Sequence, residues 1–260
     1  NWKHALENGL SYNLGISLYD YKSVVTKYFN PTGTLSTWYE GAEVGDIWGY
    51  TVNDLFRSQE DLDSYLSKVD MTHIAANWNT GDLKYEDINH DGKVNNGTNT
   101  IGNHGDLSVI GNDQPHYQYT INGGVSYKGF DFSMLWRGVA KKDMYFYRGS
   151  NIYWGFMGGW WESCLTPEHL DYFRDQPGSK YSGLYEGDAN INTDAYWPRP
   201  YLNNTEEAKN KNHANTRYLQ NAAYLRLQNV QLGYSFPRSI TSKMHLEKLR
   251  IYFSGENLLT

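Results

Sequence analysis

The stretch that decides the fold is residues 117–139, which read YQYTINGGVSYKGFDFSMLWRGV. Apolar or aromatic residues alternate with polar or small ones on both sides of Lys128-Gly129. A period of two is typical of β-strands with one apolar face. A two-residue turn at Lys128-Gly129 pairs Tyr127 with Phe130 and places the apolar residues on one face of a hairpin. The other pairs that this register predicts are Val125 with Phe132, Gly123 with Met134, and Ile121 with Trp136.

The same alternation recurs in three other segments, which predicts an antiparallel sheet. The strands of the hairpin have roughly the 9 to 11 residues with which a tilted strand crosses a bilayer. The residues of the second face are often small and neutral, as in strands that line a water-filled lumen. A hairpin of a water-soluble β-sandwich has the same pattern, so the alternation leaves both interpretations open. The predicted strands lie near residues 10–20, 117–127, 130–139, 223–236 and 249–258.

The connections between these strands are either short or very long. Residues 128–129 and 237–248 form short connections, whereas residues from about 28–116 and 140–222 form long ones. Loops in compact soluble domains have a median length of about 4 to 6 residues. Outer-membrane barrels combine short periplasmic turns with long extracellular loops. The spacing therefore favours an all-β fold that is a portion of a transmembrane antiparallel β-barrel.

The composition excludes several classes of protein. The net charge of −6 argues against nucleic-acid binding, which needs a basic surface. The single cysteine, Cys164, excludes an internal disulfide framework. Sequence motifs of zinc proteases, serine hydrolases and P-loop NTPases do not occur. The sequence has no run of 18 apolar residues and therefore predicts no transmembrane helix. We therefore expect no catalytic residues, although a pair of carboxylates for glycoside chemistry stays open.

Both long connections contain segments that predict short helices. Ser58 and Asp61 form a capping-box pattern ahead of an apolar period. Residues 166–168, Thr-Pro-Glu, predict a second helix start, with Leu170 and Phe173 on one face. We expect these helices to pack the connections together rather than to bind a ligand.

Residues 85–95, YEDINHDGKVN, have the pattern of the first half of a calcium loop. Oxygen-bearing side chains alternate, and Gly92 permits the sharp bend. The position at which an EF-hand has a bidentate Glu is Thr98, which argues against a calcium sensor. A structural calcium ion is one interpretation, and an Asx-rich turn that caps its own backbone is the other. The candidate ligands are Asp87, Asn89, Asp91, Lys93 through its carbonyl, and Asn95.

Residues 151–163, NIYWGFMGGWWES, combine large aromatic residues with glycines. Flat rings match the apolar faces of sugars, so this segment is a candidate sugar-stacking platform. A small core of the connection itself and a docking patch are the alternatives. The candidate substrate-binding residues are Tyr153, Trp154, Phe156, Trp160 and Trp161.

Five segments of the chain carry a resemblance to a known family. They are, in order, GDLKYEDINHDGKVN (81–95), VIGNDQPHYQYTINGGVSYKGFDFSMLWRGVAKKDMY (109–145), NTDAYWPRPYLN (192–203), NTRYLQNAAYLRLQNVQLGYSFP (215–237) and LRIYFSGENLLT (249–260). In sequence and order they resemble the late barrel region of the SusC/RagA-type TonB-dependent transporters. The match covers nearly the whole chain. In this family the 87–95 loop would have a structural role, since a cation would hold a long external loop together.

The resemblance implies a 22-stranded barrel with an N-terminal plug in the outer membrane of a Gram-negative, Bacteroidetes-like bacterium. It implies a SusD-like surface lipoprotein as a lid, and energy from the proton gradient through TonB, which would contact an N-terminal part missing from this chain. The cargo of the family is usually an oligosaccharide, and some relatives carry peptides. The chain would be a fragment, because five strands cannot close a barrel in lipid.

Three hypotheses for the function follow from these observations. The first is a portion of an importer of nutrient glycans, with peptide import as its variant. The second is a soluble, calcium-dependent carbohydrate-binding β module, and the third is a β-rich glycoside hydrolase. Extraction separates the first two, since a lipid-spanning barrel needs detergent and a soluble module does not.

Overall fold

The computed structural model describes residues 1–147, 151–158, 164–181, 183–201 and 204–260. It divides into two compact units, which are treated separately. The first, here called the sheet unit, consists of Asn1–Lys22, Gln114–Asp143 and Asn221–Thr260. The second, here called the loop unit, consists of Ser23–Asp113 and Met144–Gln220.

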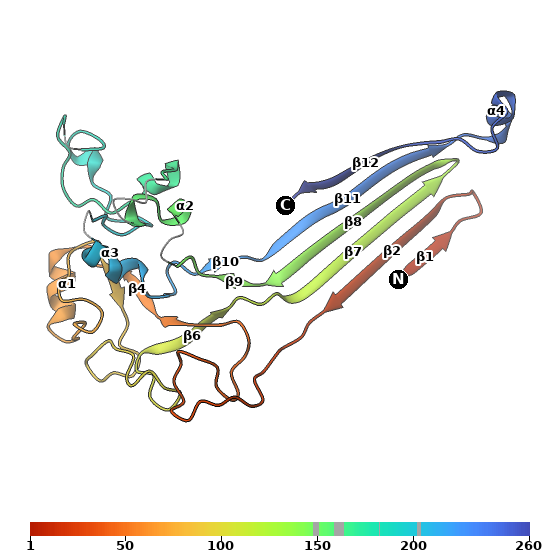
Figure 1. Ribbon diagram of the computed structural model, residues 1–260. Coiled ribbons are helices and arrows are strands. Elements are labelled where there is room, and N and C mark those ends of the chain that lie inside the picture. Colours follow the sequence, from red (N-terminus) through yellow and green to blue (C-terminus); the bar gives the residue numbers. More distant parts are fainter. Residues whose placement is uncertain (148–150, 159–163, 182, 202–203) are drawn as a thin grey trace. The chain divides into compact units, whose positions relative to one another are not determined.

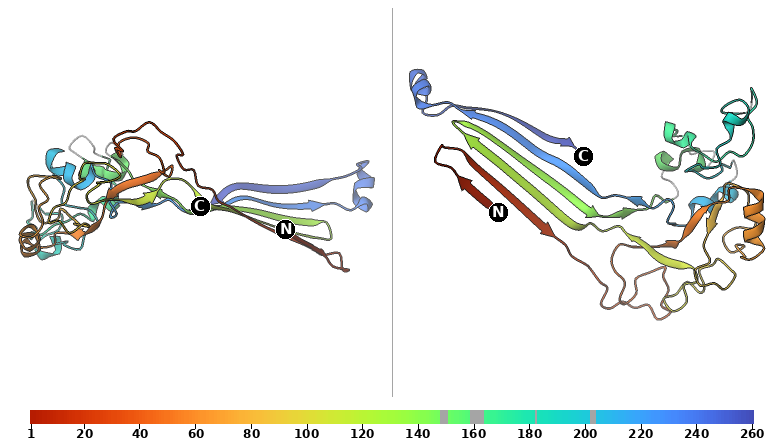
Figure 2. Two further views of the ribbon diagram at one scale, coloured as in Figure 1. Left: turned by 90° about the horizontal axis from the view of Figure 1, so that it is seen from below. Right: turned by 180° about the vertical axis from the view of Figure 1, so that it is seen from behind.

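The sheet unit is one antiparallel sheet of six strands (Figure 1). The two views in Figure 2 show its strands in a single layer. The strand order is β1-β2-β7-β8-β11-β12. Strand β1, which the alternation did not indicate, pairs with the N-terminal half of β2. The strands are β1 (Trp2–Ala5), β2 (Ser11–Tyr19), β7 (His116–Tyr127), β8 (Phe130–Lys141), β11 (Tyr224–Ser235) and β12 (Arg250–Leu259), and the helices α4 (Arg238–Thr241) and η4 (Ser242–Met244) lie between β11 and β12.

The register of the β7–β8 hairpin is the one that the alternation predicts. Tyr127 pairs with Phe130, and Ile121 pairs with Trp136. The turn residues Lys128 and Gly129 both have positive φ angles, 47° and 92°. Two consecutive positive φ angles are typical of the tight turn whose twist matches a β-hairpin. The prediction of the register is therefore confirmed.

One face of the sheet is apolar and uncovered within the unit. Tyr12, Val125, Phe132, Leu232 and Phe253 pair in turn across five strands and so form one row on this face. Leu232, which lies between Phe132 and Phe253 in the row, is 52% exposed, and Phe253 is 71% exposed. These side chains are not enclosed between two stacked sheets, which is the arrangement that a soluble sandwich requires.

A β-bulge in β11 keeps the apolar residues on this face. The register shifts between Leu227 and Asn229, which leaves Gln228 as the extra residue opposite β8. Before the bulge Leu227 pairs with Trp136, and after it the apolar residues fall on even numbers such as Leu232. An extra residue reverses the alternation of a strand. The bulge therefore keeps Leu227 and Leu232 on the same face of the sheet, although one has an odd and the other an even position along the chain.

The opposite face of the sheet carries hydrogen-bonded polar side chains. Arg250 of β12 forms an ion pair with Asp131 of β8, with Nη2 and Oδ2 2.5 Å apart. Gly233 of the intervening strand β11 lies beneath this pair, and a Cβ atom there would be 2.5 Å from the Arg250 guanidinium. At the turn end of β2 the Ser11 and Ser126 hydroxyls are 2.7 Å apart. This face is consistent with contact to water.

The loop unit is built from both long connections and has a core of its own. Strand β3 (Asp46–Tyr50) pairs with β6 (Leu107–Asn112), and β4 (Val52–Leu55) pairs with β5 (Leu83–Tyr85). Segments of the second connection pack on these strands, since Tyr85 Oη donates a hydrogen bond to the Lys209 carbonyl. The other elements that contain residues of this unit are α1 (Gln59–Leu66), α2 (Asn151–Trp154), α3 (Asn204–Lys211), η1 (Gly155–Gly158), η2 (Pro167–Leu170), η3 (Asp188–Asn190), and the paired strands β9 (Asp143–Met144) and β10 (Gln220–Asn221). The core residues include Leu55, Phe56, Leu62, Leu83, Tyr85, Trp154, Phe173, Trp197 and Tyr218.

The predicted helix starts are found with changes of detail. Ser58 caps α1 and accepts a hydrogen bond from the Asp61 amide, at 3.2 Å. The Asp61 carboxylate forms an ion pair with Lys84 at 2.6 Å. The second start is a 3-10 turn, η2. Because this turn ends at Leu170, before Phe173, the two residues do not share a helix face, and Phe173 is buried while Leu170 is 46% exposed. The prediction that these two residues share one face is wrong.

A buried ion pair joins the two connections inside the loop unit. Lys209 of α3 and Asp82 are both fully buried, with 2.8 Å between Nζ and Oδ2. Asn210 and Tyr201 each donate a hydrogen bond to the other Asp82 oxygen. Burial raises the pKa of Asp82, and Lys209 opposes that shift. Because an unpaired buried charge is strongly unfavourable, this cluster fixes how the two connections pack.

No helix in the described part of the chain has the length and apolar character needed to cross a membrane.

Candidate ligand-binding cavity

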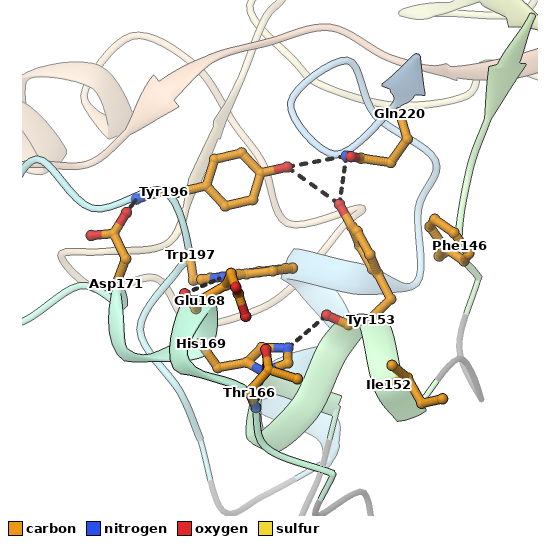
Figure 3. Close-up of a pocket in the computed structure, with 10 residues that line it drawn as sticks. All are labelled: Phe146, Ile152, Tyr153, Thr166, Glu168, His169, Asp171, Tyr196, Trp197 and Gln220. Carbon is orange, nitrogen blue, oxygen red and sulfur yellow. Dashed lines mark hydrogen bonds between the residues drawn. The ribbon is translucent and has the colours of Figure 1, made fainter. Parts of the chain in front are cut away.

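The loop unit contains an open cavity of about 1090 Å³ (Figure 3). This volume is slightly above the range of roughly 300–1,000 Å³ that is usual for small-molecule sites. Its lining comes from α2, η2, the segment that follows η3, and β10. The lining residues are Phe146, Ile152, Tyr153, Thr166, Glu168, His169, Asp171, Tyr196, Trp197 and Gln220.

The buried side chain of His169 holds two walls of the cavity together. Its Nδ1 accepts a hydrogen bond from the Thr166 amide at 3.0 Å. Its Nε2 lies 2.8 Å from the Tyr153 carbonyl, which can only accept. The two contacts together assign the proton to Nε2 and make the ring a neutral imidazole. His169 thus connects η2 to α2 and is not available as a ligand for a metal.

Aromatic rings form the floor and one wall of the cavity. Trp197 stacks on Tyr218 with ring centroids 5.4 Å apart and an interplanar angle of 17°. Tyr153 stacks on Phe146 at 4.5 Å and 20°. Tyr196 meets Trp197 edge to face at 5.0 Å. Such packing holds the rings rigid, so a ligand that stacks on them orders few side chains.

Two tyrosines and a glutamine form the polar edge of the cavity. Gln220 Nε2 donates hydrogen bonds to the hydroxyl oxygens of Tyr153, at 2.7 Å, and Tyr196, at 3.1 Å. The two hydroxyls are 3.3 Å apart. Burial raises the pKa of Tyr153, and the Tyr196 hydroxyl raises it further. Tyr153 therefore stays a neutral phenol that can donate as well as accept.

Two carboxylates stand beside the aromatic rings. The Glu168 carbonyl accepts a hydrogen bond from Trp197 Nε1 at 3.1 Å, and the Asp171 carboxylate accepts one from the Tyr196 amide at 3.1 Å. A hydrogen bond from the Thr166 side chain holds the pKa of Glu168 below its ordinary value. The cavity thus offers stacking surfaces, hydroxyl and amide groups, and negative charge.

The 85–95 loop caps its own backbone through the predicted ligand side chains. Asp87 accepts hydrogen bonds from the amides of Asp91, at 3.2 Å, and Gly92, at 2.9 Å. Asn89 Oδ1 accepts a bond from the Asp91 amide at 2.9 Å. Asp91 Oδ1 accepts the Lys93 amide at 2.9 Å. These bonds are those of an Asx-rich turn.

A residue that the sequence pattern did not indicate closes the same loop. The buried carboxylate of Asp106 accepts hydrogen bonds from the amides of Ile88 and Asn95, both at 2.8 Å. Asn95 Oδ1 accepts the Gly97 amide at 2.6 Å. Within the described ranges, no three His, Cys, Asp or Glu side chains come together as they would around a metal ion. A cation would use the second lone pairs of oxygens that already accept backbone hydrogen bonds.

The chain is similar to known proteins in sequence and in fold. No family model matches the sequence. The chain is 24% identical over 225 residues to TonB-dependent receptor P3 of Formosa agariphila, and 23% identical over 219 residues to receptor P26 of the same organism. These alignments cover 85% and 84% of the chain.

The chain is therefore similar in sequence to TonB-dependent receptors. It spans 18% of the length of each of these two receptors. The fold is also similar to solved structures of the RagAB peptide transporter, with a TM-score of 0.57 and 15% identity, and of the RagAB peptide importer in the open-open state, with 0.54 and 14%. Each match covers 99% of this chain and 24% of that chain.

The five aromatic candidates do not form one platform. Tyr153 lines the cavity. Trp154 is fully buried, and its Nε1 donates to the Phe146 carbonyl at 2.7 Å, so its ring belongs to the core and has no face open to a ligand. Phe156 packs edge to face on Tyr172 at 5.2 Å, outside the cavity lining. Trp160 and Trp161 lie outside the described residues.

Sequence reasoning missed Tyr196, Trp197 and Gln220 as lining residues. Tyr196 and Trp197 belong to NTDAYWPRPYLN, a segment that carries the family resemblance but no predicted binding residue. Their adjacent aromatic rings were a usable signal. Nothing in the sequence brings Gln220, a residue of the strand β10, to the same place as Tyr153.

Proposed function

We propose that the chain is a portion of an outer-membrane importer that takes up nutrient oligosaccharides with energy from TonB. The observation that carries the proposal is the uncovered apolar face of the six-stranded sheet. The similarity of the chain's sequence to TonB-dependent receptors supports the same proposal. Peptide import is the alternative, because the similar RagAB structures are those of a peptide transporter.

The physical argument for a membrane rests on which side of each strand is apolar. Ile16, Leu18, Phe130, Ile251 and Phe253 are each more than half exposed in the sheet unit. Large contiguous apolar patches are rare on soluble monomers. Acyl chains would remove these side chains from water, while the opposite face, with its Arg250–Asp131 ion pair, would face an aqueous lumen. Further strands must pair with the two edges of the sheet, because an open edge in lipid leaves backbone groups unsatisfied.

The loop unit would be the extracellular part that meets the cargo. Its cavity combines stacking rings with hydroxyl and amide groups, which suits a sugar or a peptide side chain. A SusD-like lipoprotein would close over this side. Capture would be followed by displacement of a plug through TonB, with no covalent chemistry and therefore no catalytic residue. The barrel would have 22 strands if it follows the family pattern.

Purification of the tagged protein from outer membranes tests this proposal. We expect extraction only with detergent, a lipoprotein partner that co-purifies, and an oligosaccharide or peptide that mass spectrometry identifies. A strain that lacks the protein should lose uptake of that ligand. Recovery of a folded monomer in the soluble fraction without detergent would overturn the membrane assignment and favour the carbohydrate-binding module.

We also propose that the 85–95 loop binds calcium in a structural role. The oxygen atoms of Asp87, Asn89 and Asp91, the Lys93 carbonyl and Asn95 are the candidate ligands. We expect millimolar calcium to raise the melting temperature of the wild-type protein and not that of the double variant Asp87→Asn/Asp91→Asn. Equal melting temperatures of the wild type in calcium and in EDTA would leave the loop as a self-capped turn.

A further inference from the structure

The charged groups in the cavity lining are all acidic. Glu168 and Asp171 both lie in the lining, and none of the ten described lining residues is Lys or Arg. Figure 3 shows Glu168 beside Trp197 and Asp171 beside Tyr196. Asp171 also accepts a hydrogen bond from Asn192 Nδ2 at 2.8 Å, which fixes its position.

Three nearby groups could supply positive charge. The Arg174 guanidinium donates to the Leu170 and Tyr172 carbonyls rather than to either carboxylate. His169 is held as a neutral ring, since Nδ1 accepts the Thr166 amide and Nε2 donates to a carbonyl. Arg217 lies 5.9 Å from the Tyr196 ring centroid. Its guanidinium donates to the carbonyls of Ala195 and Tyr196 and reaches Asp54 at 3.5 Å. Among the described lining residues, the two carboxylates therefore give a net negative charge.

The aromatic rings add to the attraction for a cation. The faces of aromatic rings carry negative potential and attract ammonium and guanidinium groups within about 6 Å of the ring centroid. Phe146, Tyr153, Tyr196 and Trp197 all line the cavity, and their mutual packing keeps them in place. A neutral sugar would use the same rings for stacking but would gain nothing from the carboxylates beyond hydrogen bonds.

We propose that this cavity selects a ligand segment that carries a protonated amine, placed against the rings and Glu168. This inference rests on the proposed import function and narrows its substrate class. The shared chemistry is an organic cation, which an amino sugar or a basic peptide side chain could supply. Polyanionic glycans would be disfavoured, because each negative group would approach Glu168 and Asp171 without a cation among the described lining residues.

Four probes in two matched pairs separate the two sources. The first pair is the glucosamine tetrasaccharide and its fully N-acetylated form, which lacks the charge. The second pair is a terminally blocked tetrapeptide with one lysine and the same peptide with acetyl-lysine. Binding to the purified protein in detergent is measured at pH 6 by titration calorimetry. The variants are Glu168→Gln and, as a matched control outside the cavity lining, Glu186→Gln.

We expect one amine probe to bind about tenfold more tightly than its acetylated partner, an effect that added salt weakens. Glu168→Gln should remove most of this preference while binding of the acetylated probe persists, which also shows that the variant is folded. Glu186→Gln should keep the preference for the amine probe. Equal binding within both pairs, a preference that survives Glu168→Gln, or no binding of any probe would overturn the inference. Import of the co-purified ligand is measured separately, so a neutral ligand that is imported would refute cation selection and leave the importer assignment standing.

Discussion

Arginine at Leu232 tests whether the apolar face of the sheet lies against lipid. Leu232 lies in the Tyr12–Phe253 row, between Phe132 and Phe253, and is 52% exposed. An exposed leucine on a soluble protein tolerates arginine with a change within about 0.5 kcal/mol. An arginine at a lipid-facing position near the bilayer midplane destabilises a barrel by about 2–4 kcal/mol. For Leu232→Arg we expect the free energy of unfolding to fall by about 2 kcal/mol, which is roughly a thirtyfold shift in the folding equilibrium.

The matched control is Ser133→Arg on the opposite face. Ser133 lies in β8 next to Phe132, the partner of Leu232, and pairs with Gly124 and Gln231. An arginine there would point into water and has Asp131 two residues away. The assay is urea unfolding of the protein in phospholipid vesicles, followed by tryptophan fluorescence. Equal unfolding free energies for the two variants would refute the lipid assignment of the Leu232 face.

Two further substitutions test the internal packing. Gly233→Val places side-chain atoms within 2.5 Å of the Arg250 guanidinium, so we expect a loss of about 1–3 kcal/mol in unfolding free energy. The same change at Gly102, where a Cβ atom meets nothing within 4 Å, should cost much less, and equal effects would contradict the packing argument. Lys209→Met leaves Asp82 buried without its cation and should destabilise the loop unit by about 3–5 kcal/mol. Because Asp82 can then take up a proton, the loss should be smaller at pH 5 than at pH 8, and hydrogen exchange at both pH values measures it.

The local sequence was sufficient for the strands with unbroken alternation. The Tyr127–Phe130 hairpin register follows from period two and a two-residue turn, because a shift by one residue would move every apolar side chain to the other face. The first half of β11 could not be predicted in this way. Its apolar residues up to Leu227 are out of phase with Leu232, and only pairing with β8 reveals that Gln228 is a bulge.

The cavity was predictable only in its aromatic composition. Tyr153, a candidate substrate-binding residue, lines the cavity, whereas Trp154 is buried in the core and packs edge to face on Trp197 and Tyr218. A tryptophan beside glycines looks the same in sequence whether its ring is open or packed. Gln220 reaches the site from β10, across a separation in sequence that no local pattern bridges.

The sequence by itself determined the β7–β8 hairpin, its apolar and polar faces and the capping of α1, because each depends on side chains that are near neighbours along the chain. The tertiary structure decided that two long connections share one core around the buried Lys209–Asp82 pair. It also decided which aromatic rings line a cavity beside Glu168. Burial depends on contacts between distant segments, and those contacts exist only once the free energy of packing has brought the segments together.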